Sequence, residues 1–575
     1  MQNANALLMN PYGLASVLGW PFFLGLALIV VALAIELLHV RLRPTSLIVL
    51  IAIFAFFIYG TASAVEPVAG LESSYIHAGF IQYILQHGHA LSDYDARFSW
   101  PGAFSLGSVF VAFTGLHNAI AFLRWFPVVI ELLYMAPLIV ISRFSGVGRR
   151  AGWLGIIIYY ASNWIYQDYF SPQALNFLFY LVIVATVLAC WQPARDEATA
   201  VQKFFGRTVT KVRLMFARFR GLGRDTYSNW SAFRVLLIMI LLSLVMLASA
   251  MSHQLTPFVI MLGLAACILT RRLGRPELLV VAFIFSVAWL SLGASGYWIG
   301  HLSVIFGGLG QVSGTLGQNV ATRIVGSFSH RLIVDGRILC ILALYSLGVV
   351  GALRRRPDSR ALEALVVAPM LLLAAQSYGG EGLLRAVLFG LPFVSLLAAS
   401  AFLPNLTGPM KAIVPQMPFR RSGRLVLGSL IAGVVFIASL GTVIVRGGND
   451  AYESYTNGEF AAVNYTYNHI TPGETLGLIV PNLPIGYRDV GVINIYSADG
   501  INLLPRVRAI TFERNHAAWI ILSQSQESWG VNVAGYPVAW ESNLEGSLLS
   551  DGYTIAKAWP TATVLRAPAS FIKKN

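Results

Sequence analysis

The chain has 575 residues, of which 56% are hydrophobic and 11% are charged, and its mean hydropathy is +0.67. A soluble protein of this length needs far more polar surface, so the composition excludes that class and indicates a polytopic membrane protein. The net charge is +14, yet residues 446–575 carry 9 Lys and Arg against 11 Asp and Glu. The positive excess therefore lies in short connections between apolar segments, where it indicates membrane orientation and no nucleic-acid partner.

Apolar stretches long enough to cross a bilayer recur as far as residue 445. We expect about 12–13 transmembrane helices, with the basic connections in the cytoplasm. A crossing by the apolar stretch 103–118 would break this alternation, so we interpret it as a re-entrant or interfacial helix. The expected spans are 17–38, 46–65, 122–143, 151–165, 173–191, 235–252, 256–271, 277–292, 338–353, 361–377, 384–403 and 425–445.

The first long connection contains "YIHAGFIQYILQHG" (75–88), whose apolar residues at helical spacing predict an amphipathic helix on the external membrane surface. Carboxylates flank this helix, with Glu66 and Glu72 before it and Asp93 and Asp95 after it. We expect Glu66, directly after a span, to be an ordinary exposed loop residue. A carboxylate at the membrane surface under an apolar rim can have its pKa raised into the range of a general base. The other three are therefore catalytic candidates.

A second external connection, "NWIYQDYFSPQ" (163–173), contains Asp168 among four aromatic residues. The aromatic residues are typical of the belt at a membrane interface, and are Trp164, Tyr166, Tyr169 and Phe170. An acidic residue at this depth is costly unless it is paired, and such residues tend to be functional. Asp168 is therefore a further catalytic candidate.

Three more external segments supply polar and cationic groups: "SHQLTPF" (252–258), residues 293–337 and "YGGEGLLR" (378–385). Arginine is sparse outside the cytoplasm, so several arginines there indicate an anionic partner, either a lipid-linked phosphate or ordinary lipid headgroups. In the third segment the acid and the arginine stand four residues apart, which also fits a plain ion pair on a helix. The candidate binding residues are His77, Arg97, His253, Gln254, Arg323, Arg331, Glu381 and Arg385.

After residue 445 no stretch of membrane-spanning length follows, and the pattern changes to that of a small α/β domain. "GEFAAVNYTYNHI" is typical of a helix, "TPGETLGLIVP" and "AAWIILS" of buried strands, and "GYTIAKAWPTATVLRA" of a terminal hairpin. We expect two domains, a transmembrane domain over 1–445 and an extracytoplasmic α/β domain over 446–575. The protein is thus predicted to be a multi-pass, α-helical protein of the plasma membrane with a C-terminal α/β domain outside the cytoplasm.

Three segments resemble the GT-C superfamily of integral-membrane glycosyltransferases: "LESSYIHAGFIQYILQHG" (71–88), "DYDARFSWPGAFSLGSVF" (93–110) and "QDYFSP" (167–172). In that superfamily an acidic residue after an early span precedes a juxtamembrane helix and a Pro-led apolar segment, and a second acid follows two spans later. The resemblance covers about residues 46–445. "NWIYQDYFSPQ" and "SHQLTPF" also resemble segments of actinobacterial membrane proteins of this kind.

The resemblance implies inverting transfer of a sugar from a polyprenyl-phosphate donor to a glycan or lipid acceptor outside the cytoplasm, in cell-wall or other polysaccharide biosynthesis. It implies a carboxylate of the first external loop as base. Glu72 matches the early acid of the superfamily, Asp93 and Asp95 match its later acidic cluster, and Asp168 matches the second-loop acid. The first external loop lacks an adjacent pair of acids, and Trp100 stands in place of the first residue of a frequent Pro-Pro, so the choice of base among the first three is left open.

The cytoplasmic connections contain no Gly-rich nucleotide fingerprint, and the three cysteines have no metal-ligand spacing. We expect no cofactor, although a divalent metal is compatible with the sequence, and membrane lipids as further partners. A lipid-linked oligosaccharide ligase or polymerase is an alternative that would depend less on carboxylates. A secondary transporter is another, but Glu131 in span 122–143 has no counterpart in a matching half.

Overall fold

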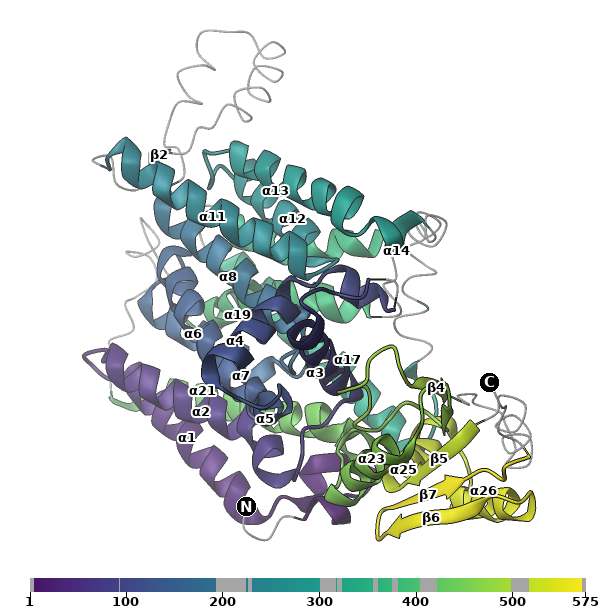
Figure 1. The fold of residues 1–575 in the computed structure, drawn as a ribbon. Coiled ribbons are helices and arrows are strands. Elements are labelled where there is room, and N and C mark those ends of the chain that lie inside the picture. The colour runs from purple at the N-terminus through teal and green to yellow at the C-terminus, as the bar shows by residue number, and fades with distance from the viewer. Residues whose placement is uncertain are drawn as a thin grey trace, which may run out of the picture.

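The structure is a computed structural model that describes residues 5–92, 94–192, 224–225, 230–299, 317, 323–354, 360–374, 381–403, 421–497 and 517–570. Within these residues the chain forms a helical bundle with a small mixed β-sheet at one end (Figure 1). Eight helices are long and apolar enough to cross a membrane. The predicted fold class, an α-helical polytopic membrane protein with a C-terminal α/β portion, is confirmed.

Each expected span falls on a helix of the bundle. The long helices are α1 (Trp20–Leu38), α2 (Pro44–Val65), α6 (Phe126–Phe144), α8 (Pro172–Cys190), α11 (Ala232–Ser252), α17 (Phe328–Arg354), α19 (Gly382–Phe402) and α21 (Arg421–Arg446). The shorter ones are α7 (Arg149–Ser162), α12 (Thr256–Leu269), α13 (Glu277–Ala288) and α18 (Ala361–Val367), with η4 (Trp289–Gly293) and η6 (Ala368–Ala374) extending the last two. Proline stands in the first turn of α1, α2, α6, α8 and α12, where its missing N–H costs no hydrogen bond.

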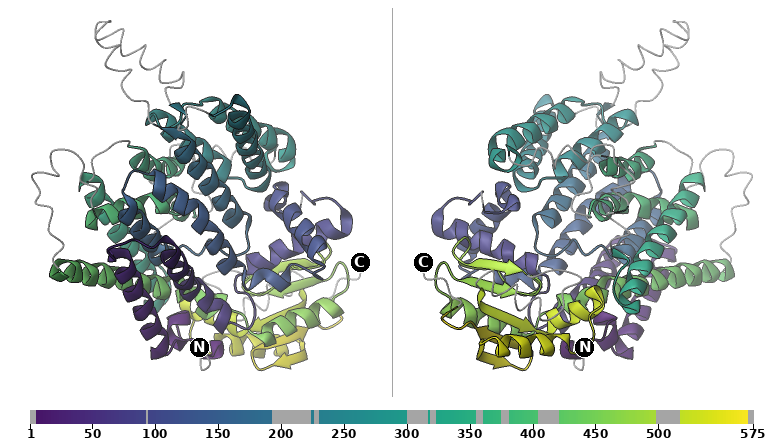
Figure 2. Two further views of the ribbon diagram at one scale, coloured as in Figure 1. Left: turned by 90° about the vertical axis from the view of Figure 1, so that its left-hand side faces the viewer. Right: turned by 90° about the vertical axis from the view of Figure 1, so that its right-hand side faces the viewer.

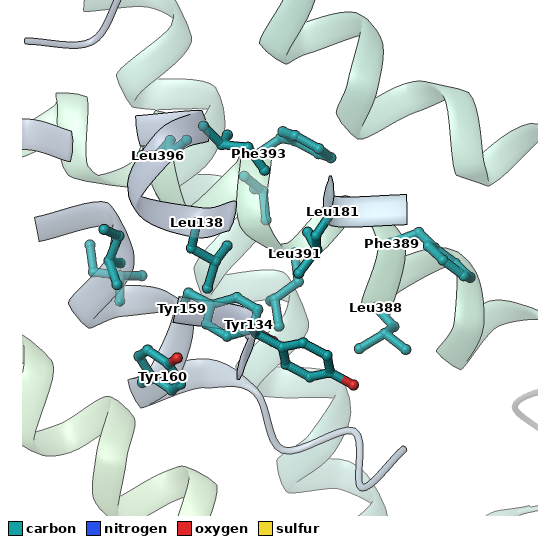
Figure 3. Packing of buried hydrophobic residues seen from close by; sticks show 14 of the residues in the cluster. Tyr134, Leu138, Tyr159, Tyr160, Leu181, Leu388, Phe389, Leu391, Phe393 and Leu396 are labelled. Carbon is teal, nitrogen blue, oxygen red and sulfur yellow. The ribbon is translucent and has the colours of Figure 1, made fainter. Parts of the chain in front are cut away.

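Helix α19 lies in the middle of the bundle and is buried along most of its length. Figure 3 shows its side chains packed among residues of α6, α7 and α8. The ring of Phe389 packs edge-on against Tyr180, with ring centroids 5.1 Å apart, and Phe177 lies 5.6 Å from the same phenylalanine. Close packing of this kind holds membrane helices together, because lipid tails are as apolar as the side chains themselves. The bundle is therefore a rigid frame for the loops at its end.

The first loop of the bundle contains α3 (Glu72–His87), η3 (Ala96–Ser99), α4 (Gly102–Thr114) and α5 (Ile120–Leu123). The helix predicted over 75–88 is confirmed as α3, and Gly88 ends it in the left-handed conformation, with φ +74°. Helix α4 rises about 20 Å at about 1.5 Å per residue, which is shorter than the hydrocarbon core of a bilayer. It packs against α3 and α11, in agreement with an interfacial or re-entrant helix shielded by protein.

The C-terminal part is a five-stranded sheet of order β4-β3-β5-β7-β6, in which β3 runs parallel to β4 and β5, and β7 antiparallel to β5 and β6. The strands are β3 (Thr475–Leu478), β4 (Asn494–Ser497), β5 (Ala517–Ser523), β6 (Thr554–Trp559) and β7 (Ala562–Arg566). The helices are α22 (Asp450–Glu453), α23 (Asn457–His469), α25 (Gln524–Trp529) and α26 (Trp540–Ser550). The predicted helix, the two buried strands and the terminal hairpin are confirmed.

Short elements complete the described chain. They are η1 (Ala6–Leu8), η2 (Gly13–Val17), β1 (Trp191–Gln192), β2 (Arg224–Asp225), α14 (Ser295–Ile299), η8 (Gly447–Asn449) and η9 (Gly530–Ala534).

One face of the sheet shares its hydrophobic core with the first loop. Phe80 of α3 and Phe104 of α4 belong to the same buried cluster as Leu476, Ile521 and Val564 of the sheet. The other face is covered by α26, so both faces of β5 are buried. The first loop and the sheet lie next to each other in both side views (Figure 2). They are therefore on the same side of the bundle.

Candidate functional site

A small cavity of about 70 Å³ lies between the first loop and the adjoining ends of α8, α11 and α19. We call it the basic cavity. It brings together five of the predicted binding residues: His77, Arg97, His253, Gln254 and Arg385. The other lining residues are Trp100, Tyr169, Ser171, Pro172, Gln173 and Ser252. No acidic residue is among those described as lining it, although Asp95 and Glu381 pair with its two arginines from outside the lining, so the groups that face the cavity are donors suited to an anion.

Arg97 is oriented by Asp95. The Nε of Arg97 donates to Asp95 Oδ1 at 2.9 Å and its Nη2 donates to Oδ2 at 2.7 Å. The same carboxylate accepts from the backbone N–H of Arg97 at 2.8 Å and so caps η3. Burial opposes ionisation of Asp95, but these hydrogen bonds and the guanidinium charge hold its pKa below the ordinary value. Asp95 is therefore an ionised partner of Arg97, which makes it a poor general base.

Arg385 forms an ion pair with Glu381, four residues before it: its Nη2 donates to Glu381 Oε2 at 2.8 Å. The sequence had left this pairing open as one interpretation. Its Nη1 donates to Gln173 Oε1 at 3.3 Å. The Nε2 amide nitrogen of Gln173 is buried and has no hydrogen-bond partner among the described residues. This unused donor lies in the wall of the basic cavity, where an anionic oxygen would satisfy it.

The two histidines of the basic cavity are neutral. Burial, with Arg385 adding to it, holds the pKa of His253 well below the ordinary value. His253 Nδ1 accepts from the backbone N–H groups of Leu255 and Thr256, both at 3.2 Å, so the ring proton is on Nε2. That Nε2 lies 3.3 Å from Arg385 Nη1. Burial lowers the pKa of His77 to about 3.

Tyr169 separates the basic cavity from a second one, because it lines both. Its ring stacks on His77 with ring centroids 6.2 Å apart and an interplanar angle of 6°. His77 is fixed in turn by a 2.9 Å hydrogen bond that its Nδ1 donates to the carbonyl oxygen of Phe170. The aromatic residues of this segment were expected in an interfacial belt. That interpretation is wrong for Trp164, which is 5% exposed, whereas Tyr169 is half-buried.

We call the second cavity, of about 220 Å³, the aromatic cavity. It contains two predicted binding residues, Arg323 and Glu381. Its other lining residues are Leu71, Ser73, Trp164, Ile165, Tyr166, Gln167, Tyr169, Val334, Arg337, Ile338, Ile341, Leu383, Leu384, Asn449 and Glu453. The lining contains two arginines and two glutamates, and one of the glutamates, Glu381, pairs with Arg385 of the basic cavity.

Glu72 is the first residue of α3, and its neighbours Leu71 and Ser73 both line the aromatic cavity. The carboxylate is half-buried and has no hydrogen bond or ion pair in the part of the chain that the structure describes. Burial raises the pKa of Glu72 to about 8, with Arg97 opposing the rise and Asp95 adding to it. A carboxylate with a pKa near neutrality is suited to accept a proton in catalysis.

The other predicted site residues lie elsewhere. Asp168 lines neither cavity, because both of its oxygens accept from Arg446 Nη2, at 2.8 and 2.9 Å. The two side chains are 3% and 6% exposed, which makes this a buried ion pair. Arg331 is exposed on α17 and also lines neither cavity. Asp93 lies outside the described residues.

Three polar residues were missed or misjudged from the sequence. Glu66 was expected to be exposed but is 3% exposed, because the loop folds back over the end of α2; the expectation was wrong. Its position directly after a span, at a depth where an unpaired acid is costly, was the available signal. Gln167 and Gln173 gave no signal, since a neutral amide in a loop is ordinary in any protein.

Among the described residues, no three or more His, Cys, Asp or Glu side chains are grouped as metal ligands. Cys190, Cys267 and Cys340 are free thiols. The residues that are present in the two cavities offer guanidinium, imidazole, amide and single carboxylate groups.

No family model matches the chain, and no curated protein matches it. Solved structures of GT-C glycosyltransferases are similar to it in fold. ArnT from Cupriavidus metallidurans, bound to undecaprenyl phosphate, has a TM-score of 0.48 at 12% identity over 93% of this chain and 100% of that chain. The archaeal oligosaccharyltransferase AglB from Archaeoglobus fulgidus, in complex with an inhibitory peptide and a dolichol-phosphate, has a TM-score of 0.47 at 12% identity over 86% and 71%. These sources lend no support to the actinobacterial resemblance, and likenesses this distant transfer no activity.

Proposed function

We propose that the protein is a membrane glycosyltransferase that moves a sugar from a polyprenyl-phosphate donor to an acceptor on the extracytoplasmic side of the plasma membrane. One observation carries the proposal. An anion-binding cavity with Arg97 and Arg385 in its wall lies beside an unpartnered carboxylate, Glu72, whose pKa is raised to about 8. A phosphate-binding group and a general base are the two parts that this transfer needs.

The basic cavity holds the donor phosphate. Arg385 and His253 both line it, and the amide nitrogen of Gln173 has no other partner among the described residues. Arg97 presents its remaining N–H groups while Asp95 fixes its orientation. Donors that are already in place at the leaving phosphate stabilise the charge that develops on it without reorganisation.

The reaction is a single displacement. The acceptor hydroxyl oxygen attacks the anomeric carbon of the donor sugar and forms the new glycosidic bond, while the bond from that carbon to the phosphate oxygen breaks. The hydroxyl proton passes to the Glu72 carboxylate, and polyprenyl phosphate leaves as the anion held by the arginines. Attack opposite to the leaving group inverts the anomeric centre. Asp95 and Asp168 take no proton in this scheme and act as positioning residues for Arg97 and Arg446.

The test is the pH dependence of transfer from a synthetic polyprenyl-phosphate sugar. Glu72 acts as a base only when it is ionised, so turnover should rise with pH through about 8 and level off above it. Glu72→Gln removes the base and should lower turnover by about 100-fold or more above pH 8, where wild-type Glu72 is ionised, and by less at lower pH. Wild-type turnover that is flat between pH 6 and 9 would contradict the assignment of Glu72.

The arginines are tested by Arg97→Lys and Arg385→Lys, with Arg331→Lys as the matched control on the exposed face of α17. Lysine retains the charge but cannot form the guanidinium fork, so each cavity variant should raise the KM for the donor by about 10-fold while the control stays normal. If all three behave like wild type, the phosphate is bound elsewhere. Transfer that survives Glu72→Gln but not the arginine variants would favour a lipid-linked oligosaccharide ligase or polymerase.

A further inference from the structure

We propose that the aromatic cavity binds the acceptor, and that the part of the acceptor bound there is an uncharged saccharide ring. This inference rests on the proposed function, because it takes the donor phosphate to be in the basic cavity. It goes further by assigning a second, separate cavity and by naming the chemical class that fits it. The two cavities share Tyr169 as a wall, so two ligands bound in them would lie side by side.

The charge of the aromatic cavity favours a neutral ligand. The lining of the aromatic cavity itself contains two carboxylates, Glu381 and Glu453, beside Arg323 and Arg337. In the basic cavity the carboxylates that pair with Arg97 and Arg385, Asp95 and Glu381, stand outside the described lining. An anionic ligand gains from the basic cavity and has no comparable reason to enter the aromatic one. The basic cavity therefore suits a phosphate, and the aromatic cavity suits an uncharged group.

The unsatisfied polar atoms of the two cavities support the same assignment of ligands. The Oε1 oxygen of Gln167 is buried in the wall of the aromatic cavity and has no hydrogen-bond partner among the described residues. It is an acceptor that needs a donor, and sugar hydroxyls are donors. The corresponding unsatisfied atom of the basic cavity is the amide nitrogen of Gln173, a donor that suits a phosphate oxygen.

Three aromatic side chains from one segment, Trp164, Tyr166 and Tyr169, line this cavity. An aromatic ring is a large, rigid and amphipathic contact surface, and such a surface suits the apolar face of a sugar ring. Trp164 and Tyr166 are each backed by a guanidinium, Arg337 at 5.9 Å and Arg446 at 4.3 Å from the ring centroid. The rings are thus fixed before a ligand arrives, which lowers the entropy that binding costs.

The backbone around the aromatic cavity is strained in a way typical of functional sites. Leu71 and Tyr166 both line it, and both have positive φ, at 64° and 60°. Side chains with a Cβ rarely adopt this conformation, and it persists only where the surroundings enforce it. The conformation of Leu71, which directly precedes α3, is held by a 3.1 Å hydrogen bond from its N–H to the carbonyl oxygen of Glu453.

One wall of the aromatic cavity is a preformed chain of polar groups. Arg337 Nη2 donates to Asn449 Oδ1 at 2.9 Å, and Asn449 Nδ2 donates to Glu453 Oε1 at 3.1 Å. The segment that carries the base of the proposed reaction adjoins this wall, because Leu71 donates to the carbonyl oxygen of Glu453 and Glu72 stands between the two lining residues Leu71 and Ser73. A ring bound here would lie next to that segment and, across Tyr169, next to the donor.

The experiment replaces Gln167 by Leu, which keeps the size of the side chain and removes its acceptor oxygen. Gln82→Leu is the matched control, since Gln82 also has a buried, unpartnered Oε1 but lines neither cavity. Full-length protein in nanodiscs is titrated calorimetrically with a panel of neutral methyl glycosides, and KM values for donor and acceptor are measured separately. We expect Gln167→Leu to weaken binding of the recognised glycoside and to raise the acceptor KM by about 10-fold, with the donor KM unchanged.

The possible outcomes separate this inference from the proposed function. If Gln167→Leu raises only the donor KM, the aromatic cavity holds the donor sugar and the inference is overturned. If wild type transfers sugar from the polyprenyl donor but no glycoside binding responds to Gln167, the inference fails and the proposed function stands. If a glycoside binds in a Gln167-dependent manner while no polyprenyl donor is used, the saccharide site stands and the proposed transfer is wrong.

Discussion

Four carboxylates near the cavities illustrate how the surroundings of a residue set its role. Asp95 is paired with a half-exposed arginine, Asp168 with a buried one, Glu381 with Arg385, and Glu72 has neither a hydrogen bond nor an ion pair among the described residues. Burial without a partner raises a carboxyl pKa, whereas an arginine partner lowers it. Glu72, whose pKa burial raises to about 8, is therefore the candidate general base.

The two aspartates should respond in opposite ways to the same substitution. Asp168→Asn leaves Arg446 buried and unpaired, so it should destabilise the protein by about 3–5 kcal/mol. Asp95→Asn keeps the cap of η3 and loses a partly exposed pair worth about 1 kcal/mol or less, but Arg97 loses its orientation and donor KM should rise. Thermal unfolding and donor kinetics of both variants check this. An Asp168→Asn protein of normal stability but without turnover would instead assign Asp168 to the chemistry.

Helix α3 is the element that joins the proposed chemistry to the C-terminal sheet. It carries Glu72 at its start and His77 in its second turn, and its apolar face belongs to the core of the sheet. Its closest approach to the C-terminal part is at Gly79, where an added Cβ would collide with the carbonyl oxygen of Gly486. Gly486 has φ +77°, so neither position accepts a side chain without a shift of the backbone.

Gly79→Ala should therefore displace α3 from the sheet. Overpacking of this kind costs about 1–3 kcal/mol, and a shift of about 1 Å at the base can lower turnover by about 100-fold. Gly433→Ala in α21 is the control, because a Cβ there meets no atom within 4 Å and alanine favours a helix. Thermal unfolding and turnover are measured for both variants. Equal behaviour of the two would mean that the contact between α3 and the sheet does not position the base.

Local patterns predicted the elements well, and contacts between distant segments account for what the sequence did not show. Apolar spacing with a terminal glycine predicted α3, and strand alternation predicted the hairpin of β6 and β7. The ion pair of Asp168 joins residues 278 positions apart, and the burial of Glu66 depends on how a loop returns to the bundle. Neither follows from spacing along the chain. The same holds for Gln167, whose importance arises only from the cavity around it.

At the scale of the whole molecule, the shared core restricts the membrane topology. The first loop and the C-terminal sheet bury one continuous set of side chains, so both must be on one side of the membrane. The basic connections between the spans predict that this side is extracytoplasmic. Both cavities lie at the same end, next to α3. The side of the membrane on which the sheet lies is therefore also the side of the proposed transfer.

Cysteine labelling answers this question. Gln86 of α3, Ser550 of α26 and Thr45 at the start of α2 are exposed, and the three native cysteines can be removed for a silent background. With a membrane-impermeant maleimide on intact cells, we expect Gln86→Cys and Ser550→Cys to react, and Thr45→Cys to react only after permeabilisation. Reaction of Thr45→Cys alone would invert the orientation but leave the shared core intact. Reaction of only one of the two variants Gln86→Cys and Ser550→Cys would put the first loop and the sheet on opposite sides of the membrane. A single buried core does not allow that arrangement.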